Sequence, residues 1–179
     1  RTVTRYKLLS RMYAQKYHKV KISEDAILYE TRDGQNISDS PLSVLKYLLK
    51  NEEYNGFKHY IVFQRAYEEA VILGLELQGI DINDDRVILL RRNTPEYIDL
   101  MLRAKYLLTD STFQNFFVKK PEQIYINTWH GTPLKYMGYA MPNGVIGSWN
   151  VMRNFFMSDY LVSPNEHTTN VYLNDYMLN

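Results

Sequence analysis

The chain has 179 residues, of which 45% are apolar and 23% charged, and this is enough for one ordinary domain with its own core. It contains no cysteine, which excludes disulfides, thiolate nucleophiles and cysteine-ligated zinc sites. The formal net charge is +1, and no apolar run reaches the roughly 18 residues that a membrane span requires.

The N-terminal segment differs in charge from the rest of the chain. Residues 1–21 hold seven Lys or Arg and no acid, whereas the remaining residues hold 14 basic and 20 acidic side chains. Five apolar or aromatic side chains would share one face of a helix here: Tyr6, Leu9, Tyr13, Tyr17 and Val20. We predict a basic amphipathic helix or linker over 1–24. It could pack on the domain, contact an anionic membrane surface or bind nucleic acid.

Six short runs rich in β-branched and aromatic residues follow, and such runs are typical of buried parallel strands. They are 26–30, 59–63, 86–90, 106–110, 123–127 and 160–163. Helical patterns separate most of them. The alternation predicts an α/β fold over 25–179, a Rossmann-like parallel sheet of five or six strands with helices on both faces.

Two helix starts combine a capping hydroxyl with proline. We predict Ser40 as a cap with Pro41 at the first helical position, and Thr94 as a cap before Pro95. A third start of this kind is predicted at Thr132-Pro133. Two further helices are expected over 144–156 and 165–178.

The carboxyl ends of parallel strands are the usual ligand-binding edge of such a sheet. The residues that follow the predicted strands are polar here: Glu30, Arg32, Asp33, Ser38, Asp39, Ser40, Gln64, Arg65, Arg91, Arg92, Asn93, Asp110, Ser111, Thr112, Asn165, Glu166 and His167. The simpler interpretation is that these loops are polar because they are exposed to solvent.

The loop after the fifth predicted strand is different in kind. His130 precedes Gly131, whose backbone can adopt positive φ or approach a ligand closely, and the predicted helix at Thr132 would direct its positive end there. Lys135 adds a cation. These residues predict an anion site beside a titratable imidazole, while a structural histidine that caps its own turn is the alternative.

The other histidines show no metal-ligand spacing. We interpret His59, at a predicted strand start, and His167, in a predicted helical first turn, as surface or capping residues.

Residues 126–138, INTWHGTPLKYMG, resemble the Trp-His-Gly-Thr-Pro-Leu-Lys signature of the CDP-glycerol glycerophosphotransferase family, which primes and polymerises teichoic acids. Three other segments are similar to that family: ILYETRDGQNISDSPLSVLKYL, RNTPEYIDLMLRAKYLLTDSTF and SDYLVSPNEHTTNVY. The resemblance covers the chain from about Ile27 to its end. It implies the N-terminal, acceptor-side half of a GT-B fold, truncated before the nucleotide-binding domain.

The resemblance also implies the reaction and its partners. An acceptor hydroxyl, on a glycerol phosphate polymer or a lipid-linked primer, would attack the glycerol-bearing phosphate of CDP-glycerol and release CMP, with His130 as base and Asp39 orienting it or the acceptor. Gly131, Thr132 and Lys135 would meet phosphate. Ser38, Ser40 and Asp110 are further candidates for substrate contacts.

No metal, cofactor or nucleic acid is expected for this reaction, and the implied location is peripheral, on the cytoplasmic face of the cell membrane. Two alternatives stay open. One is a non-catalytic domain of the same fold that binds a polyanion or a membrane, and the other is a GT-B glycosyltransferase that uses a nucleotide sugar.

Overall fold

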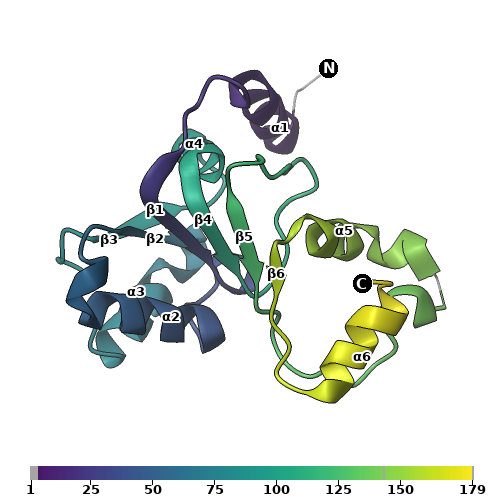
Figure 1. Ribbon diagram of the computed structural model, residues 1–179. Coiled ribbons are helices and arrows are strands. Elements are labelled where there is room, and N and C mark those ends of the chain that lie inside the picture. The colour runs from purple at the N-terminus through teal and green to yellow at the C-terminus, as the bar shows by residue number, and fades with distance from the viewer. Residues whose placement is uncertain (1–3, 143, 179) are drawn as a thin grey trace.

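The computed structural model describes residues 4–142 and 144–178, apart from the side chain of Val145. Its centre is a six-stranded sheet in the order β3-β2-β1-β4-β5-β6, in which all neighbouring strands run parallel (Figure 1). The strands are β1 (Ser23–Glu30), β2 (Lys58–Phe63), β3 (Val87–Arg91), β4 (Ala104–Thr109), β5 (Ile124–Asn127) and β6 (Tyr160–Leu161). Each overlaps one of the six predicted runs, so the parallel α/β prediction is confirmed.

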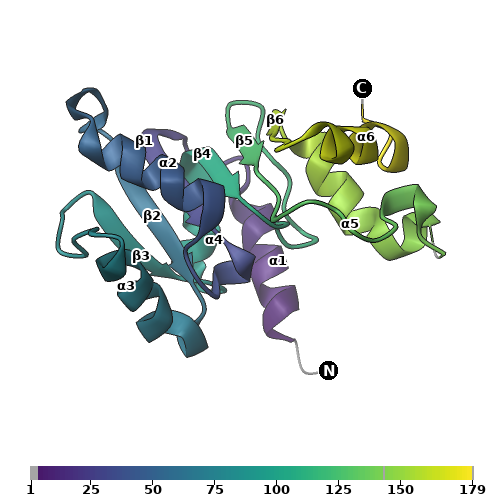
Figure 2. The same ribbon diagram turned by 90° about the horizontal axis from the view of Figure 1, so that it is seen from below.

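Helices cover both faces of this sheet (Figures 1 and 2). Helices α2 (Asp39–Lys50) and α3 (Glu68–Leu77) lie on one face, and α1 (Arg5–Lys16) and α4 (Pro95–Arg103) lie on the other. Because successive side chains of a strand point to opposite faces, Leu28 of β1 joins the core under α4, whereas Tyr29 joins the core under α2. Two apolar cores therefore sandwich the sheet.

Helix α1 packs its apolar face on the domain. Leu9 and Tyr13 are almost fully buried and belong to the same core as α4. The hydroxyl of Tyr13 donates a hydrogen bond to the carbonyl oxygen of Val118 at 2.6 Å, and Lys16 forms an ion pair with Asp99 of α4 at 2.7 Å. Of the three interpretations of this segment, the structure shows packing on the domain.

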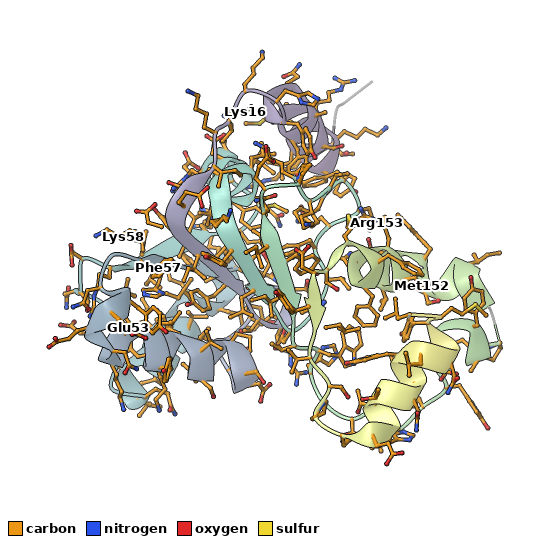
Figure 3. The ribbon with its side chains drawn as sticks, in the orientation of Figure 1. Lys16, Glu53, Phe57, Lys58, Met152 and Arg153 are labelled. Carbon is orange, nitrogen blue, oxygen red and sulfur yellow. The ribbon has the colours of Figure 1, made fainter. Side chains whose placement is uncertain are left out.

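Helices α5 (Gly144–Met157) and α6 (Glu166–Asp175) enclose a third, smaller core beside β6, and they confirm the two helices predicted near the end of the chain. Met152 packs in this core, while the neighbouring Arg153 lies toward the main sheet and donates to the carbonyl oxygen of Phe117 (Figure 3). Between them, these side chains fix α5 to both cores. None of the described helices is both long and apolar enough to cross a membrane.

The predicted helix starts have different outcomes. Thr94 caps α4 by accepting from the N–H of Tyr97, with Pro95 in the first turn, as predicted. Helix α2 begins earlier than predicted, so the assignment of Ser40 as its cap is wrong. The N–H groups of the first turn of a helix have no intrahelical partner, so proline, which lacks an N–H, is tolerated at several positions there. A proline therefore does not show at which residue the helix begins.

The helix predicted at Thr132-Pro133 does not form, and residues 128–137 are irregular. Tertiary contacts hold this segment instead: Asn165 donates to the hydroxyl of Thr132 at 3.0 Å, and the Nε2 of His167 donates to the carbonyl oxygen of Pro133 at 2.9 Å. The loop is thus anchored to the start of α6. The expected helix dipole at this loop, with Lys135 in its first turn, is absent.

His59 is a further correction, because its side chain is fully buried instead of lying at the surface. Its Nδ1 is hydrogen-bonded to the hydroxyl of Tyr29 at 3.0 Å, and its Nε2 is buried with no hydrogen-bond partner in the described chain.

Candidate functional site

Three strands end at the same level, and this brings their following loops together. Glu30 of β1 and Asn127 of β5 are both aligned with Thr109 at the end of β4. Beyond this row, the side chain of Asn127 donates to the carbonyl oxygen of Ser111 at 2.8 Å and accepts from the N–H of Trp129 at 2.8 Å. Asn127 therefore folds the loop after β5 over the end of β4.

This fold-back places the imidazole of His130 at the carboxyl edge of the sheet, as predicted. Its Nδ1 lies 2.6 Å from the carbonyl oxygen of Asp110. A carbonyl oxygen only accepts, so Nδ1 carries the hydrogen and Nε2 keeps a lone pair in the neutral ring. Nε2 makes no hydrogen bond in the described chain, and the ring stacks on the indole of Trp129 with 4.3 Å between centroids. The imidazole is therefore oriented and able to accept a proton.

Backbone strain is concentrated at this edge. Among the described residues, six non-glycine residues have positive φ. All but Met177 lie between the carboxyl end of a strand and the first residue of the α-helix that follows, that residue included: Arg32, Asp33, Asp39, Asn93 and Trp129. Such conformations cost on the order of 1–3 kcal/mol each and persist where the surrounding structure enforces them. At Trp129 the enforcing contacts are the Asn127 hydrogen bond and an edge-to-face contact with Phe155 at 5.1 Å.

The carboxylate of Asp110 lies buried behind the imidazole. Its Oδ1 accepts from the N–H of Arg32 at 2.8 Å, and its Oδ2 is buried without a hydrogen-bond partner in the described chain, 3.9 Å from Nε of Arg32. Burial raises the pKa of this carboxyl, while the Arg32 N–H and the nearby His130 act in the opposite direction. Asp110 thus supplies a carbonyl oxygen to His130, and its buried carboxylate holds the backbone of Arg32.

A cavity of about 260 Å³ opens in front of the imidazole. Four of the predicted site residues line it: Asp39, Ser40, His130 and Gly131. Gly131 has a φ of 121° and open space around it, so it meets the conformational expectation. Ser38 and Lys135 do not line this cavity, and Thr132 is hydrogen-bonded to Asn165 instead.

The partner of His130 differs from the residue named from sequence. Asp39 shares the cavity with His130, but no hydrogen bond joins the two side chains in the described structure, and the carbonyl of Asp110 is the partner. A backbone acceptor leaves no trace in residue identity, so sequence reasoning had no signal for it. Arg32 also lines the cavity. Its only signal in the sequence is its place among the many polar residues that follow a strand.

A charged network lies under the same edge, between β1 and β3. Glu30 is buried and accepts from Arg92 at 3.0 Å and from the hydroxyl of Tyr97, while Arg92 also donates to Asp33 at 2.9 Å. Burial raises the pKa of Glu30, and Arg92 and Tyr97 oppose this. No group of three His, Asp or Glu side chains within residues 4–142 and 144–178 could hold a metal ion.

Fold and site together define a Rossmann-like α/β domain with a histidine site at the carboxyl edge of its sheet. Solved structures of the wall teichoic acid polymerase TagF share this GT-B-like fold, and one, soaked with CDPG, aligns over 98% of this chain with a TM-score of 0.77 and 22% identity. A model of the CDP-glycerol:poly(glycerophosphate) glycerophosphotransferase family matches residues 11–179. The chain belongs to this family, which confirms the resemblance seen in the sequence.

Two relatives extend the comparison. The chain is 28% identical to a teichoic acid poly(glycerol phosphate) polymerase of Bacillus spizizenii over 92% of its length, and 26% identical to a teichoic acid glycerol-phosphate transferase of Staphylococcus aureus over 96%. It spans only 42% and 40% of those two proteins, and 41% of the TagF chain.

Proposed function

We propose that this chain is the acceptor-side part of a longer glycerophosphotransferase, which moves glycerol phosphate from CDP-glycerol to a teichoic-acid-type acceptor and releases CMP. The observation that carries this proposal is the state of His130. Its Nδ1–H donates to the Asp110 carbonyl oxygen, its Nε2 makes no hydrogen bond within the described residues, and the side chain lines a cavity at the carboxyl edge of the sheet.

In the proposed reaction, the oxygen of an acceptor hydroxyl bonds to the glycerol-bearing phosphorus. The bond from that phosphorus to the oxygen bridging it to CMP breaks, and the electron pair leaves with CMP. The hydroxyl proton passes to Nε2 of His130. Phosphoryl transfer depends mainly on alignment and charge stabilisation, so an oriented base and a confined cavity are the contributions that this chain can make.

Asp110 would stabilise the imidazolium formed in this step. Its carbonyl oxygen lies 2.6 Å from Nδ1, and its buried carboxylate is close enough to interact electrostatically with His130. Asp39, Ser40 and Gly131, which line the cavity, are proposed substrate contacts, whereas Lys135 has no structural support for that role. We place the nucleotide contacts mainly outside this chain, because the chain spans about two fifths of its relatives.

Replacement of His130 by alanine in the full-length protein tests the proposal. The rate of glycerol phosphate transfer should fall about 10²–10⁴-fold, the usual contribution of a general base, with little change in the free energy of unfolding. His18→Ala is the matched control, since His18 is exposed and does not line the cavity. If His130→Ala keeps its activity per folded molecule, the histidine is structural. If UDP-sugars, and not CDP-glycerol, are consumed, the glycosyltransferase alternative replaces this proposal.

We further propose that the protein acts peripherally at the cytoplasmic face of the membrane, where a lipid-linked acceptor would be found. The supporting feature is the outer side of α1, on which Lys7, Arg11 and Leu8 are exposed after the apolar side has packed on the domain. Juxtamembrane cations of this kind are attracted to anionic lipid at about 1 kcal/mol each.

A further inference from the structure

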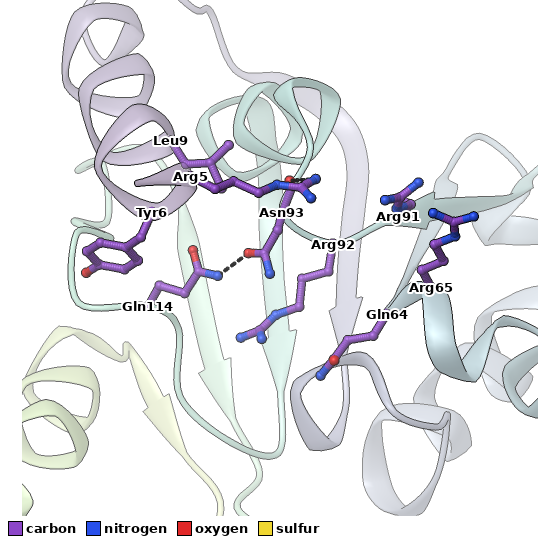
Figure 4. A pocket seen from close by; sticks show the side chains of 9 residues that line it. All are labelled: Arg5, Tyr6, Leu9, Gln64, Arg65, Arg91, Arg92, Asn93 and Gln114. Atoms are coloured by element: carbon purple, nitrogen blue, oxygen red, sulfur yellow. Dashed lines mark hydrogen bonds between the residues drawn. The ribbon is translucent and has the colours of Figure 1, made fainter. Parts of the chain in front are cut away.

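A second cavity, of about 310 Å³, opens between the first residues of α1 and the residues that end or follow β2 and β3 (Figure 4). Its walls carry four arginines from three parts of the chain: Arg5 of α1, Arg65 after β2, and Arg91 and Arg92 at and after the end of β3. No residue lines both this cavity and the one at His130. We refer to it as the arginine cavity.

The charges in the arginine cavity are not balanced. No Asp or Glu lines it. Arg92 is neutralised by Glu30 and Asp33, and Arg5 donates to the carbonyl oxygen of Asn93 at 2.8 Å, which carries no formal charge. Arg65 and Arg91 form no ion pair and no side-chain hydrogen bond within residues 4–142 and 144–178. Three guanidinium groups therefore share a recess that no carboxylate lines, and such a recess attracts an anion.

The directions of approach favour phosphate as that anion. Guanidinium groups recognise carboxylate and phosphate by paired N–H donors. A planar carboxylate offers its oxygens in one plane, whereas a tetrahedral phosphate offers them in several directions. Arg65 and Arg91, after and at the ends of neighbouring strands, lie together on one side of the cavity, whereas Arg5 approaches from the other, so their donors can meet a tetrahedral group from more than one direction (Figure 4).

Gln114 orients one wall of the same cavity. It donates its amide N–H to the side chain of Asn93, whose backbone carbonyl oxygen accepts from Arg5 (Figure 4). A cavity lined by oriented cations and no carboxylate fits a ligand that carries phosphate.

We propose that the arginine cavity binds a phosphate of the polyol phosphate acceptor chain, at a unit behind the hydroxyl that reacts at His130; this rests on the proposed function. Both cavities open at the carboxyl edge of the sheet, and the turn that contains Arg32 and Asp33 lies between them: Arg32 lines the His130 cavity, and Asp33 is bonded to Arg92 of the arginine cavity. A flexible acceptor with repeated phosphates could thus contact both.

Binding measurements on this chain test the proposal. Isothermal titration calorimetry would compare a soluble glycerol phosphate oligomer of defined length with inorganic phosphate, and co-sedimentation would use vesicles of neutral and anionic phospholipid. Arg65→Gln and Arg91→Gln should each weaken oligomer binding about tenfold, as expected for one charge-assisted contact, and the wild-type affinity should fall at high salt. Arg65 is exposed, so its variant should fold even if Arg91→Gln does not.

Lys50→Gln is the matched control, because Lys50 is an exposed cation at the end of α2 that lines neither cavity. If this control weakens oligomer binding as much as Arg65→Gln does, or if neither Arg65→Gln nor Arg91→Gln has an effect, the proposal is overturned. Binding of anionic vesicles but not of the oligomer would also overturn it, in favour of a lipid headgroup site.

The outcome is separable from that of the proposed function. His130→Ala should retain oligomer binding in the arginine cavity. If His130→Ala loses glycerol phosphate transfer but still binds the oligomer, both proposals are supported. If it retains transfer, His130 is not the base, and the oligomer-binding measurements alone test the arginine cavity.

Discussion

Helix α1 should contribute a large part of the stability of this domain, and Tyr13 is the residue that tests this most directly. Its side chain is 3% exposed, and its ring contacts Phe116 and Phe117 with centroid distances of 5.5 and 6.3 Å. Its hydroxyl donates to the carbonyl oxygen of Val118 at 2.6 Å and accepts from the N–H of the same residue at 3.3 Å.

Two substitutions separate these contributions. Tyr13→Ala leaves a cavity among the aromatic rings and should lower the free energy of unfolding by about 3–5 kcal/mol. Tyr13→Phe keeps the ring but leaves the Val118 groups unpaired, at a cost of about 1–3 kcal/mol. Domains are typically stable by only about 5–15 kcal/mol, so the alanine variant should lose roughly a fifth or more of its stability.

Urea denaturation followed by intrinsic fluorescence measures both effects. Leu8→Ala is the matched control on the same helix, since Leu8 is 52% exposed and should change the free energy of unfolding by less than about 0.5 kcal/mol. Vesicle co-sedimentation at low and high salt, with and without residues 1–21, then tests membrane contact. If Tyr13→Ala is as stable as the control while deletion of 1–21 abolishes vesicle binding, α1 is not docked in solution and its apolar face serves the membrane.

Two further predictions concern buried titratable groups. Burial lowers the pKa of His59 from its usual 6.5 to about 4. Between these pH values the unfolded chain binds a proton at His59 that the folded chain does not. The free energy of unfolding should therefore be highest above about pH 6.5 and fall by on the order of 3 kcal/mol as the pH drops toward 4. Urea curves across this range should show a smaller decline for His59→Asn, and an equal decline would refute the assignment. Arg92→Met should lower the free energy of unfolding by about 3–5 kcal/mol, because it leaves the buried Glu30 carboxylate without its ion-pair partner. The loss should be larger at pH 7.5 than at pH 5, where Glu30 can take up a proton, and should shrink in Arg92→Met/Glu30→Gln; equal losses at both pH values would contradict this.

The regular elements of this fold could be predicted from the sequence because local patterns determine them. Short apolar runs marked all six strands, and the Thr94-Pro95 pair marked the start of α4. The Trp-His-Gly-Thr-Pro-Leu-Lys run indicated the family, and its place after the fifth strand put His130 at the carboxyl edge. These inferences depend on residue type and spacing along the chain, which sequence records directly.

Tertiary structure decided the features that depend on partners distant in the chain. Thr132-Pro133 has the local pattern of a helix start, yet hydrogen bonds from Asn165 and His167 hold it irregular. His59 can be buried because the hydroxyl of Tyr29 on the neighbouring strand forms a hydrogen bond with its ring. His130 is oriented by the backbone carbonyl of Asp110, a group that every residue type carries. Side chains of α1, of the residues after β2 and of the end of β3 meet in the arginine cavity only because the fold brings these segments together. A local pattern sets a preference of about 1 kcal/mol, which such contacts readily exceed.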